Sequence, residues 1–313
     1  MRNYQRLLQV DRSSLKGMHF VVLKGGPGKE RAISLQSGAS VADALRSRQY
    51  YVTEIDVTKD LVDLPKGTDL VFNTIHGTFG EDGCLQDLLE ERGVPFTGDG
   101  AAGCRLAFDK ILAKRRFVRA GIPTSPFEVL SSGEQPSFAP PFVLKPPCQG
   151  SSIGVHVVHN RQQIPLAMEN VLKYGDKVLL ESFFLGRELT VSVVANTVLP
   201  IVEIVSTNGV YSYENKYVSG RSEYFAPARL SSDHTAATMD TALAAHQALG
   251  LQLCSRVDIL LSEEGRLNVL EVNTIPGMTP FSLMPRAAAA IGIDLSLLCE
   301  IIAVISLQKW KKA

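Results

Sequence analysis

Acidic and amide side chains in the C-terminal part of the sequence have the spacing of a site for a divalent cation. Glu271 and Asn273 lie two residues apart in LNVLEVNTIPGMTPFSL, an apolar stretch that runs into a Gly/Pro turn. Arg256 and Asp258 have the same spacing in SRVDILL. Side chains two residues apart in a strand point to the same face, and oxygen ligands suit Mg²⁺ and Mn²⁺. The sequence therefore predicts two strands that each present polar groups on one face.

A hairpin would bring these two strands together. The intervening sequence SEEGR contains Gly265 and is typical of a tight connection. A loop over residues 263–266 pairs Ser262 with Leu267, and the register of the hairpin can be counted from that pair.

This register places Asp258 opposite Glu271 and Arg256 opposite Asn273. Directly opposed residues have Cβ atoms roughly 5 Å apart, so we expect the two carboxylates to share one cation. The pattern alone also fits a solvated hairpin face with ordinary surface ion pairs. The opposite face is expected to be apolar and to consist of Val257, Ile259, Leu270 and Val272.

The first third of the sequence has the pattern of an α/β domain. His19 to Leu23 is an apolar strand, followed by the glycine-rich turn KGGPGKE and a helix, with Glu30 where turn and helix meet. The glycines allow backbone N–H groups to approach an anion at the helix N-terminus. The turn matches neither GxGxxG nor GxxxxGK[ST], which disfavours a nicotinamide dehydrogenase and a P-loop protein.

A second strand, Asp69 to Ile75, leads into His76 and the loop GTFGEDG. Open α/β sheets bind ligands at the carboxyl ends of their strands. His76 is therefore a candidate site residue, with a structural histidine as the alternative.

Basic and small residues follow in the middle of the chain. Glycines within 98–103 mark a domain boundary, after which a basic helix carries Lys110. Lys145 ends a strand and precedes a small-residue hairpin over 150–154. The amides and hydroxyls of this hairpin could cover phosphates, and an ordinary glycine/serine turn is the alternative.

Two glutamates and two phenylalanines follow in ESFFLGRE. Glu181 ends one strand and Glu188 begins the next, while Phe183 and Phe184 suit an adenine pocket or a packed core equally well. The tyrosine-rich stretch 206–229 is too long for an ordinary connection. A loop of this length is usually functional or disordered, and its four tyrosines disfavour disorder. The family resemblance given below implies that it is a lid, which we expect to be mobile without ligand and ordered with ATP and a substrate analogue.

Composition excludes several classes of protein. The 313 residues suit about two domains, with three small ones as an alternative. Basic and acidic residues balance, 32 against 32, so no overall field favours nucleic acid or a membrane surface. The five cysteines lack a paired spacing, which disfavours disulfides or zinc and favours the cytoplasm. We read no signal peptide or membrane span, and interpret residues 1–16 as an extension.

Eight motifs in order give the sequence a resemblance to the D-alanine:D-alanine ligases of the ATP-grasp superfamily, from about Met18 to the C-terminus. The motifs are GGPGKERAISLQSG, HGTFGEDGCLQ, FTGDGAAGCRLAFDK, VLKPPCQGSSIGV, ESFFLGRELTV, YENKY, SRVDI and LEVNTIPGMTPFSLMP. The resemblance implies an α/β ATP-grasp fold. Its parts would be an N-terminal parallel-sheet domain over 1–98 and two α+β domains over 99–182 and 183–313. It also implies a homodimer.

The resemblance further implies roles for individual residues. The nucleotide would be bound by Lys110, Lys145, Ser151, Glu181, Phe183, Phe184, Glu188, Lys216 and Leu270. Two Mg²⁺ or Mn²⁺ ions would be held by Asp258, Glu271 and Asn273. The amino-acid substrates would contact Glu30, His76, Arg256, Gly277, Ser282 and Leu283. The catalytic set would be Glu30, Ser151, Tyr217, Arg256 and Gly277.

The activity implied by the resemblance is ATP-dependent formation of D-alanyl-D-alanine through an acyl phosphate. Two alternatives remain at this point. One is an ATP-grasp ligase that joins another pair, such as D-alanine with D-lactate or another small amino acid. The other is a nucleotide-binding relative that has lost turnover. Tyr217 favours the dipeptide, and the complete set of polar residues favours an active enzyme.

Overall fold

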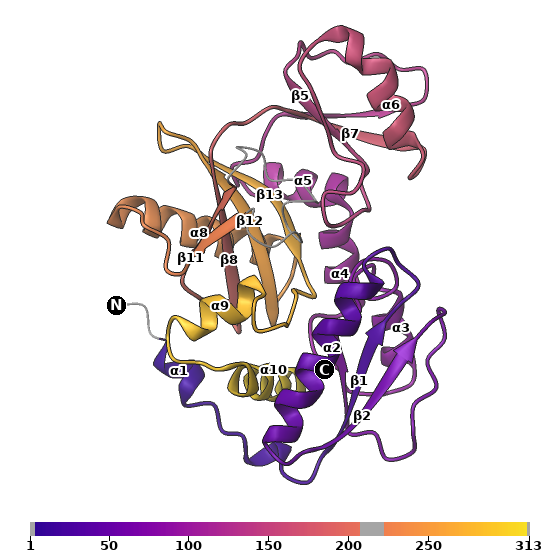
Figure 1. The fold of residues 1–313 in the computed structure, drawn as a ribbon, viewed down its shortest axis with the longest axis vertical. Helices are drawn as coiled ribbons and strands as arrows, with labels where there is room; N and C mark the ends of the chain where they lie inside the picture. Colours follow the sequence, from indigo (N-terminus) through magenta and orange to yellow (C-terminus); the bar gives the residue numbers. More distant parts are fainter. Residues whose placement is uncertain (1–3, 207–221, 312–313) are drawn as a thin grey trace.

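The computed structural model describes residues 4–206 and 222–311, and the described chain is built around three β-sheets. Figure 1 shows the parallel sheet below and the two antiparallel sheets above and beside it. No helix in the described ranges is long and apolar enough to cross a membrane.

The N-terminal sheet is parallel, in the order β2-β1-β3, which confirms the predicted α/β pattern. Its strands are β1 (His19–Gly25), β2 (Tyr51–Val57) and β3 (Leu70–Asn73). The nearby helices are α2 (Arg31–Ser47), α3 (Cys84–Glu91) and α10 (Leu295–Trp310). Phe20 and Val22 pack in one core with residues of α2 and α10, while Val21 and Leu23 pack in another with residues of α3. Both faces are therefore covered, which explains the continuous apolar run in β1.

The central sheet is antiparallel, in the order β4-β7-β5-β6. Its elements are β4 (Phe127–Ser131), β5 (Phe142–Lys145), β6 (His156–Val158), the 3-10 turn η2 (Arg161–Gln163), α6 (Ile164–Leu172) and β7 (Lys177–Ser182). Phe142 and Leu144 pack in one core with Val171 of α6. The alternate residues Val143 and Lys145 therefore face the other way, into a pocket.

The largest sheet has the order β11-β10-β8-β12-β13, with β9 paired to β8. Its strands are β8 (Arg187–Val194), β9 (Thr197–Val198), β10 (Val202–Ser206), β11 (Ser222–Phe225), β12 (Cys254–Leu261) and β13 (Leu267–Asn273). Helices α4 (Ala101–Phe108), α5 (Lys110–Arg119) and α8 (Ser232–Ala248) contribute to the core on one of its faces. The strand β11 corrects the prediction of one irregular stretch over 206–229, because residues 222–225 pair with β10.

The hairpin of β12 and β13 has the predicted register at its polar end and a different one at its loop. Asp258 lies opposite Glu271, and Arg256 lies opposite Asn273, as predicted. At the loop, however, Leu267 pairs with Leu261 instead of Ser262. A β-bulge between these two ends leaves Leu270 as an extra residue on β13.

The bulge also overturns the predicted core face of β13. Leu270 lines the pocket together with Glu271, whereas Val269 and Val272 are fully or almost fully buried in the core. The extra residue shifts the alternation of side chains by one position, so the adjacent residues Leu270 and Glu271 both face the pocket. The other three residues predicted for the core, Val257, Ile259 and Val272, do lie there.

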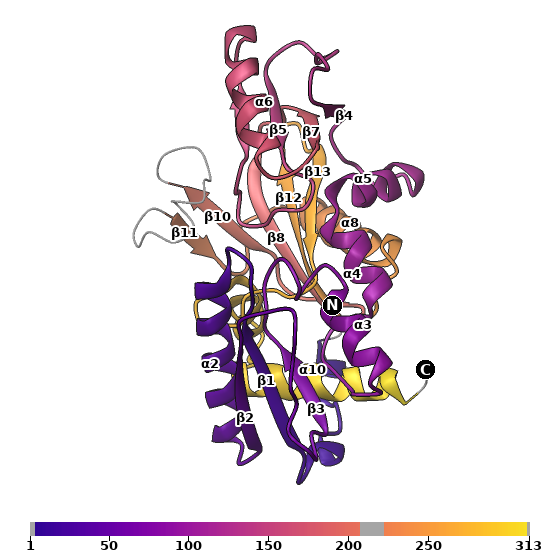
Figure 2. The same ribbon diagram turned by 90° about the vertical axis from the view of Figure 1, so that its right-hand side faces the viewer.

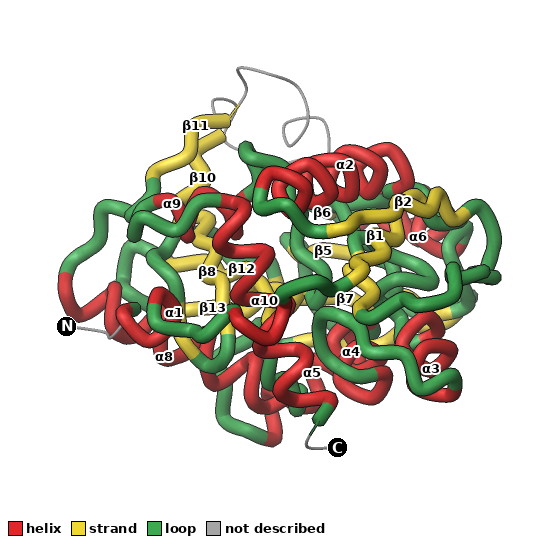
Figure 3. The backbone as a smooth tube through the Cα atoms, turned by 90° about the horizontal axis from the view of Figure 1, so that it is seen from below, coloured by secondary structure: helices red, strands yellow, loops and turns green. Residues whose placement is uncertain are grey.

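The chain ends of the described structure meet in one core. Figure 2 shows α10 running beside the parallel sheet, and Figure 3 shows it between that sheet and α9 (Leu283–Ala289). The N-terminal helix α1 (Gln5–Leu8) and the 3-10 turn η1 (Ser13–Leu15) bury Leu7 and Leu15 in the same core. Residues 4–16 are therefore an integral part of the fold, which corrects their interpretation as an extension.

We expect Leu15→Ala to lower the free energy of unfolding by about 2–5 kcal/mol, because Leu15 is fully buried and its truncation leaves a cavity. Urea unfolding followed by circular dichroism measures the change. Leu8→Ala is the matched control, because Leu8 is 41% exposed in the same segment. Equal effects of the two substitutions would contradict the assignment of this segment to the core.

Candidate active site

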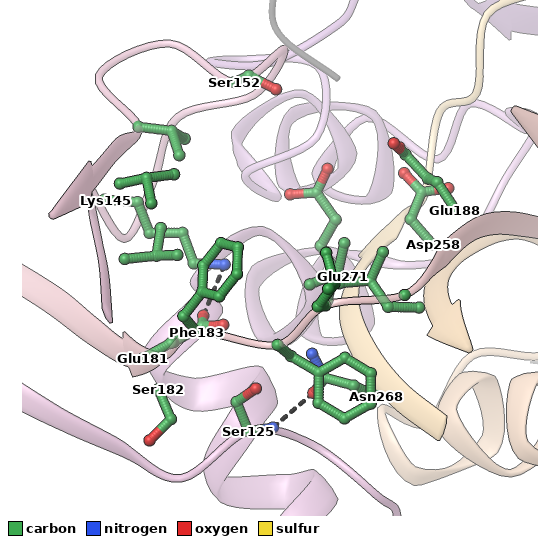
Figure 4. A pocket seen from close by; sticks show the side chains of 18 of the residues that line it. Ser125, Lys145, Ser152, Glu181, Ser182, Phe183, Glu188, Asp258, Asn268 and Glu271 are labelled. Carbon is green, nitrogen blue, oxygen red and sulfur yellow. Dashed lines mark hydrogen bonds and ion pairs between the residues drawn. The ribbon is translucent and has the colours of Figure 1, made fainter. Parts of the chain in front are cut away.

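A pocket of about 670 Å³ lies between the polar faces of the central sheet and the largest sheet (Figure 4). Residues from β5, β6, β7, β8, β10, β12 and β13, from the loop between β5 and β6, and the first residue of α5 line it. It brings together nine residues that the sequence had singled out: Lys110, Lys145, Glu181, Phe183, Phe184, Glu188, Asp258, Leu270 and Glu271.

Two lysines hold Glu181 at one wall of the pocket. Lys145 Nζ lies 2.6 Å from Glu181 Oε1, and Lys114 Nζ lies 3.2 Å from Glu181 Oε2. The Lys114 ammonium also donates to Thr124 Oγ1 at 2.6 Å. Sequence reasoning missed Lys114, although it lies four residues after Lys110 and so shares its face of α5.

Asp258 is surrounded by donors on the polar face of the hairpin. Arg256 makes a bidentate contact with it, from Nε to Oδ1 at 2.9 Å and from Nη2 to Oδ2 at 2.8 Å. Thr190, which pairs with Asp258 from the neighbouring strand β8, donates to Oδ1 at 2.7 Å. Asn273 Nδ2 donates to Oδ2 at 3.2 Å. The bidentate contact fixes the planar guanidinium of Arg256 against Asp258, which lines the pocket.

Glu271 is held from the opposite side by α5. Lys110 Nζ lies 3.0 Å from Glu271 Oε2 and donates to the carbonyl oxygen of Gln149 at 2.7 Å. Helix α5 starts at Lys110 because the Asp109 side chain caps it, accepting from the N–H groups of Ile111 and Leu112. The cap thus fixes the position of Lys110, whose side chain reaches Glu271.

The donor set on the hairpin fits a hard divalent cation. Asp258 and Glu271 are directly opposed, and Asn273, which donates its amide N–H to Asp258, keeps a carbonyl oxygen as a further ligand. Within the described ranges no group of three His, Cys, Asp or Glu side chains is placed to hold a metal. The candidate set therefore depends on two carboxylates and an amide, with remaining ligands to come from substrate oxygens and water.

Glu30 joins the N-terminal part of the chain to the hairpin after β5. Ser151 Oγ donates a hydrogen bond to Glu30 Oε1. A Cβ at Gly150 would lie 2.5 Å from Glu30 Oε2, and one at Gly77 would lie 2.7 Å from the same oxygen. A side chain at either position would therefore displace the Glu30 carboxylate from this place.

His76 fastens the turn after β13. Its Nδ1 lies 2.8 Å from the carbonyl oxygen of Ile275, and its Nε2 lies 3.1 Å from Ser37 Oγ, which accepts from the Met278 N–H at 3.2 Å. A carbonyl only accepts, so Nδ1 carries the proton, and the Ser37 hydroxyl donates to Nε2. Burial lowers the pKa of His76, in agreement with this neutral ring.

Glu81 also holds the turn after β13, and the sequence analysis did not single it out. It accepts from the Ile275 N–H at 3.0 Å and from the Gly77 N–H at 2.7 Å. Burial, together with the nearby charge of Glu30, raises the pKa of Glu81 to about 8. The signal available in the sequence was only its place in the GEDG loop beside His76.

The remaining predicted residues lie around the same turn or outside the described structure. A Cβ on Gly277 would lie 2.8 Å from Ser282 Oγ, which is 2.9 Å from Thr279 Oγ1. Leu283 begins α9 and packs against the core that contains α10. Lys216 and Tyr217 lie outside the described residues, as does most of the expected lid.

Family models and known proteins resemble this chain over most of its length. The models described as D-ala D-ala ligase N-terminus and C-terminus match residues 62–99 and 117–303. A protein of Methylacidiphilum infernorum named D-alanine--D-alanine ligase is 47% identical, with 94% of this chain and 97% of that protein covered. One from Pelobacter propionicus with the same name is 41% identical, with 90% and 93% covered.

A solved structure has the same arrangement of elements. The D-alanine--D-alanine ligase from Bacillus anthracis complexed with ATP superimposes with a TM-score of 0.84 at 28% identity. The match covers 95% of this chain and 99% of that one. The expected ATP-grasp fold is thereby confirmed. With two family models and long relatives above 40% identity in agreement, this chain belongs to the D-alanine--D-alanine ligase family.

Proposed function

We propose that this protein joins two D-alanine molecules into D-alanyl-D-alanine, with conversion of ATP to ADP and phosphate, for peptidoglycan precursor synthesis. The observation that carries the proposal is a pocket lined by two ion pairs, one of which leads to Glu30. The pairs Lys145–Glu181 and Lys110–Glu271 both line the pocket. Lys110 also binds the carbonyl oxygen of Gln149, and the next residue, Gly150, lies against the Glu30 carboxylate.

The chemistry explains why a nucleotide pocket must adjoin an amino-acid site. A carboxylate is a poor electrophile, so the first D-alanine must receive the γ-phosphoryl group of ATP and become an acyl phosphate. The amine of the second D-alanine then attacks the acyl carbon, a peptide bond forms, and phosphate leaves. Positioning and charge stabilisation supply most of the catalysis in phosphoryl transfer.

The pocket residues supply the nucleotide site of this proposal. Lys110 and Lys145 hold phosphate oxygens, Glu181 and Glu188 hold the adenosine, and Phe183 packs on it. The other contacts are assigned to Phe184, Leu270, Ser151 and, outside the described structure, Lys216. Asp258, Glu271 and Asn273 would hold two Mg²⁺ or Mn²⁺ ions, which when bound neutralise charge on the phosphates.

The amino-acid site lies where the three parts of the chain meet. We assign Glu30, oriented by Ser151, to the ammonium of the first D-alanine. Arg256 and the Gly277 N–H stabilise the oxyanion of the tetrahedral intermediate, as fixed donors do. Ser282, Leu283 and the turn held by His76 receive the second D-alanine. The lid and Tyr217 would exclude water, which otherwise hydrolyses the acyl phosphate.

We further propose that the protein is a homodimer and works in the cytoplasm.

The proposed reaction predicts phosphate release from ATP only when D-alanine and Mg²⁺ are both present. A panel of D-alanine, L-alanine, glycine, and D-alanine with D-lactate distinguishes the dipeptide ligase from ligases of other pairs, with products identified by mass spectrometry. Phosphate release that needs no amino acid would sink the ligase assignment.

For Arg256→Ala we expect kcat to fall by about 10²–10³-fold, the size typical for loss of an oxyanion donor, with little change in ATP affinity. Arg119→Ala, on the exposed end of α5, is the control. If ATP affinity falls as steeply as kcat, Arg256 is a structural partner of Asp258 and not a group that acts on the intermediate.

Glu271→Gln should raise the Mg²⁺ concentration needed for half-maximal activity and weaken Mn²⁺ binding in the presence of ATP, measured by electron paramagnetic resonance. The substitution keeps the shape of the side chain and removes its charge, which a hard cation requires. Glu264→Gln is the control, because this carboxylate lies exposed in the loop of the same hairpin. Unchanged Mn²⁺ binding in Glu271→Gln would remove this residue from the metal site.

A further inference from the structure

Lys114 is a buried cation for which the proposed reaction gives no role. Its side chain is 0% exposed, on the face of α5 that also carries Lys110. Charged side chains are almost never fully buried unless they are paired. Its partners are the Glu181 carboxylate at 3.2 Å and the Thr124 hydroxyl at 2.6 Å.

The charges around Glu181 do not balance. Two ammonium groups, those of Lys114 and Lys145, face the single carboxylate of Glu181, and all three side chains are less than 10% exposed. Of the other carboxylates that line the pocket, Glu271 faces Lys110, Asp258 faces Arg256 and Glu203 faces Arg187. Glu188 lies across the pocket, beside Asp258 (Figure 4). Within the described residues, the three side chains of Lys114, Lys145 and Glu181 by themselves therefore hold one positive charge in excess.

The excess charge is directed into the pocket. Lys114 does not line the pocket, whereas Lys145 and Glu181 do. Thr124 Oγ1 donates to the carbonyl oxygen of Val269 at 2.9 Å, so the hydroxyl offers its lone pair to Lys114 and fixes the ammonium behind the wall. An unbalanced buried charge is costly, and an anion in the pocket would offset that cost.

We infer that Lys114 is a positioning residue for the nucleotide: from behind the wall it neutralises Glu181 and so leaves the charge of Lys145 available to the triphosphate. This inference rests on the proposed nucleotide site. Without Lys114, Glu181 and Lys145 form a neutral pair, and the wall loses its attraction for phosphate.

A lowered proton affinity agrees with this arrangement. Burial lowers the pKa of Lys114 to about 8, Glu181 opposes that change, and the Lys145 charge adds to it. The titratable groups that face the Lys114 ammonium are those of Glu181 on β7 and Lys145 on β5. A positive charge that is costly to keep in the free protein is one that a bound anion stabilises.

Calorimetric binding of ATP and of adenosine to the full chain tests the inference without any ligation assay. For Lys114→Met we expect ATP to bind at least about tenfold more weakly, the size of a contact to a charged group, and adenosine to bind within about twofold of the unmodified protein. Arg115→Met, on the exposed side of the same helix, should leave both affinities unchanged. Equal weakening of ATP and adenosine would show a merely structural role and overturn the inference.

A second comparison isolates the partner through which Lys114 acts. In the Glu181→Gln variant Lys145 has lost its carboxylate partner. Adding Lys114→Met to this variant should therefore change its ATP affinity by less than about threefold. This pair also serves if Lys114→Met alone does not fold, because neither variant leaves a buried carboxylate beside a missing cation. A further tenfold loss in the double variant would show that Lys114 acts independently of Glu181. Both experiments measure only nucleotide binding. They therefore test the role of Lys114 even if the phosphate-release assay contradicts the proposed ligase activity.

Discussion

The carboxylates of Asp258 and Glu271 face each other across the hairpin of β12 and β13, and the contacts around them offset the repulsion between their charges. Like charges directly opposite in a sheet are destabilising. Each carboxylate therefore has its own cation, Arg256 for Asp258 and Lys110 for Glu271. Because Lys110 comes from α5, the acidic pair is compensated only when that helix packs on the sheet, which it does through residues such as Phe117.

The same dependence extends to the other parts of the chain. Lys110 also donates to the carbonyl of Gln149, one residue before the glycine that leaves room for the Glu30 carboxylate. On the far side, Gly77 approaches Glu30 and donates its N–H to Glu81, which binds the turn after β13. Charged groups and backbone amides thus connect all three sheets through a small volume. Apolar packing holds each sheet, and these polar contacts set how the sheets meet.

Much of this was readable from the sequence, and the exceptions have physical causes. The polar end of the hairpin, the parallel sheet and the hairpin after Lys145 follow from local alternation and turn residues. The loop pairing and the side of Leu270 do not, because a bulge adds one residue without any turn signal. Lys114 and Glu81 were not predicted for another reason. Each has one partner far away in the sequence, Glu181 for Lys114 and Ile275 for Glu81, so only the folded chain shows that they are buried.

The bulge at Leu270 gives the hairpin a property useful for engineering. Strand β12 pairs with β8 along its whole length without a register shift, so the polar end is anchored independently of the loop. An extra residue already separates the pairing near Leu267 from the pairing at Glu271. The exposed residues Glu263 and Glu264 of the connecting loop are consequently the place to insert a tag or a foreign peptide, because the pairing of β12 with β8 keeps the acidic pair aligned.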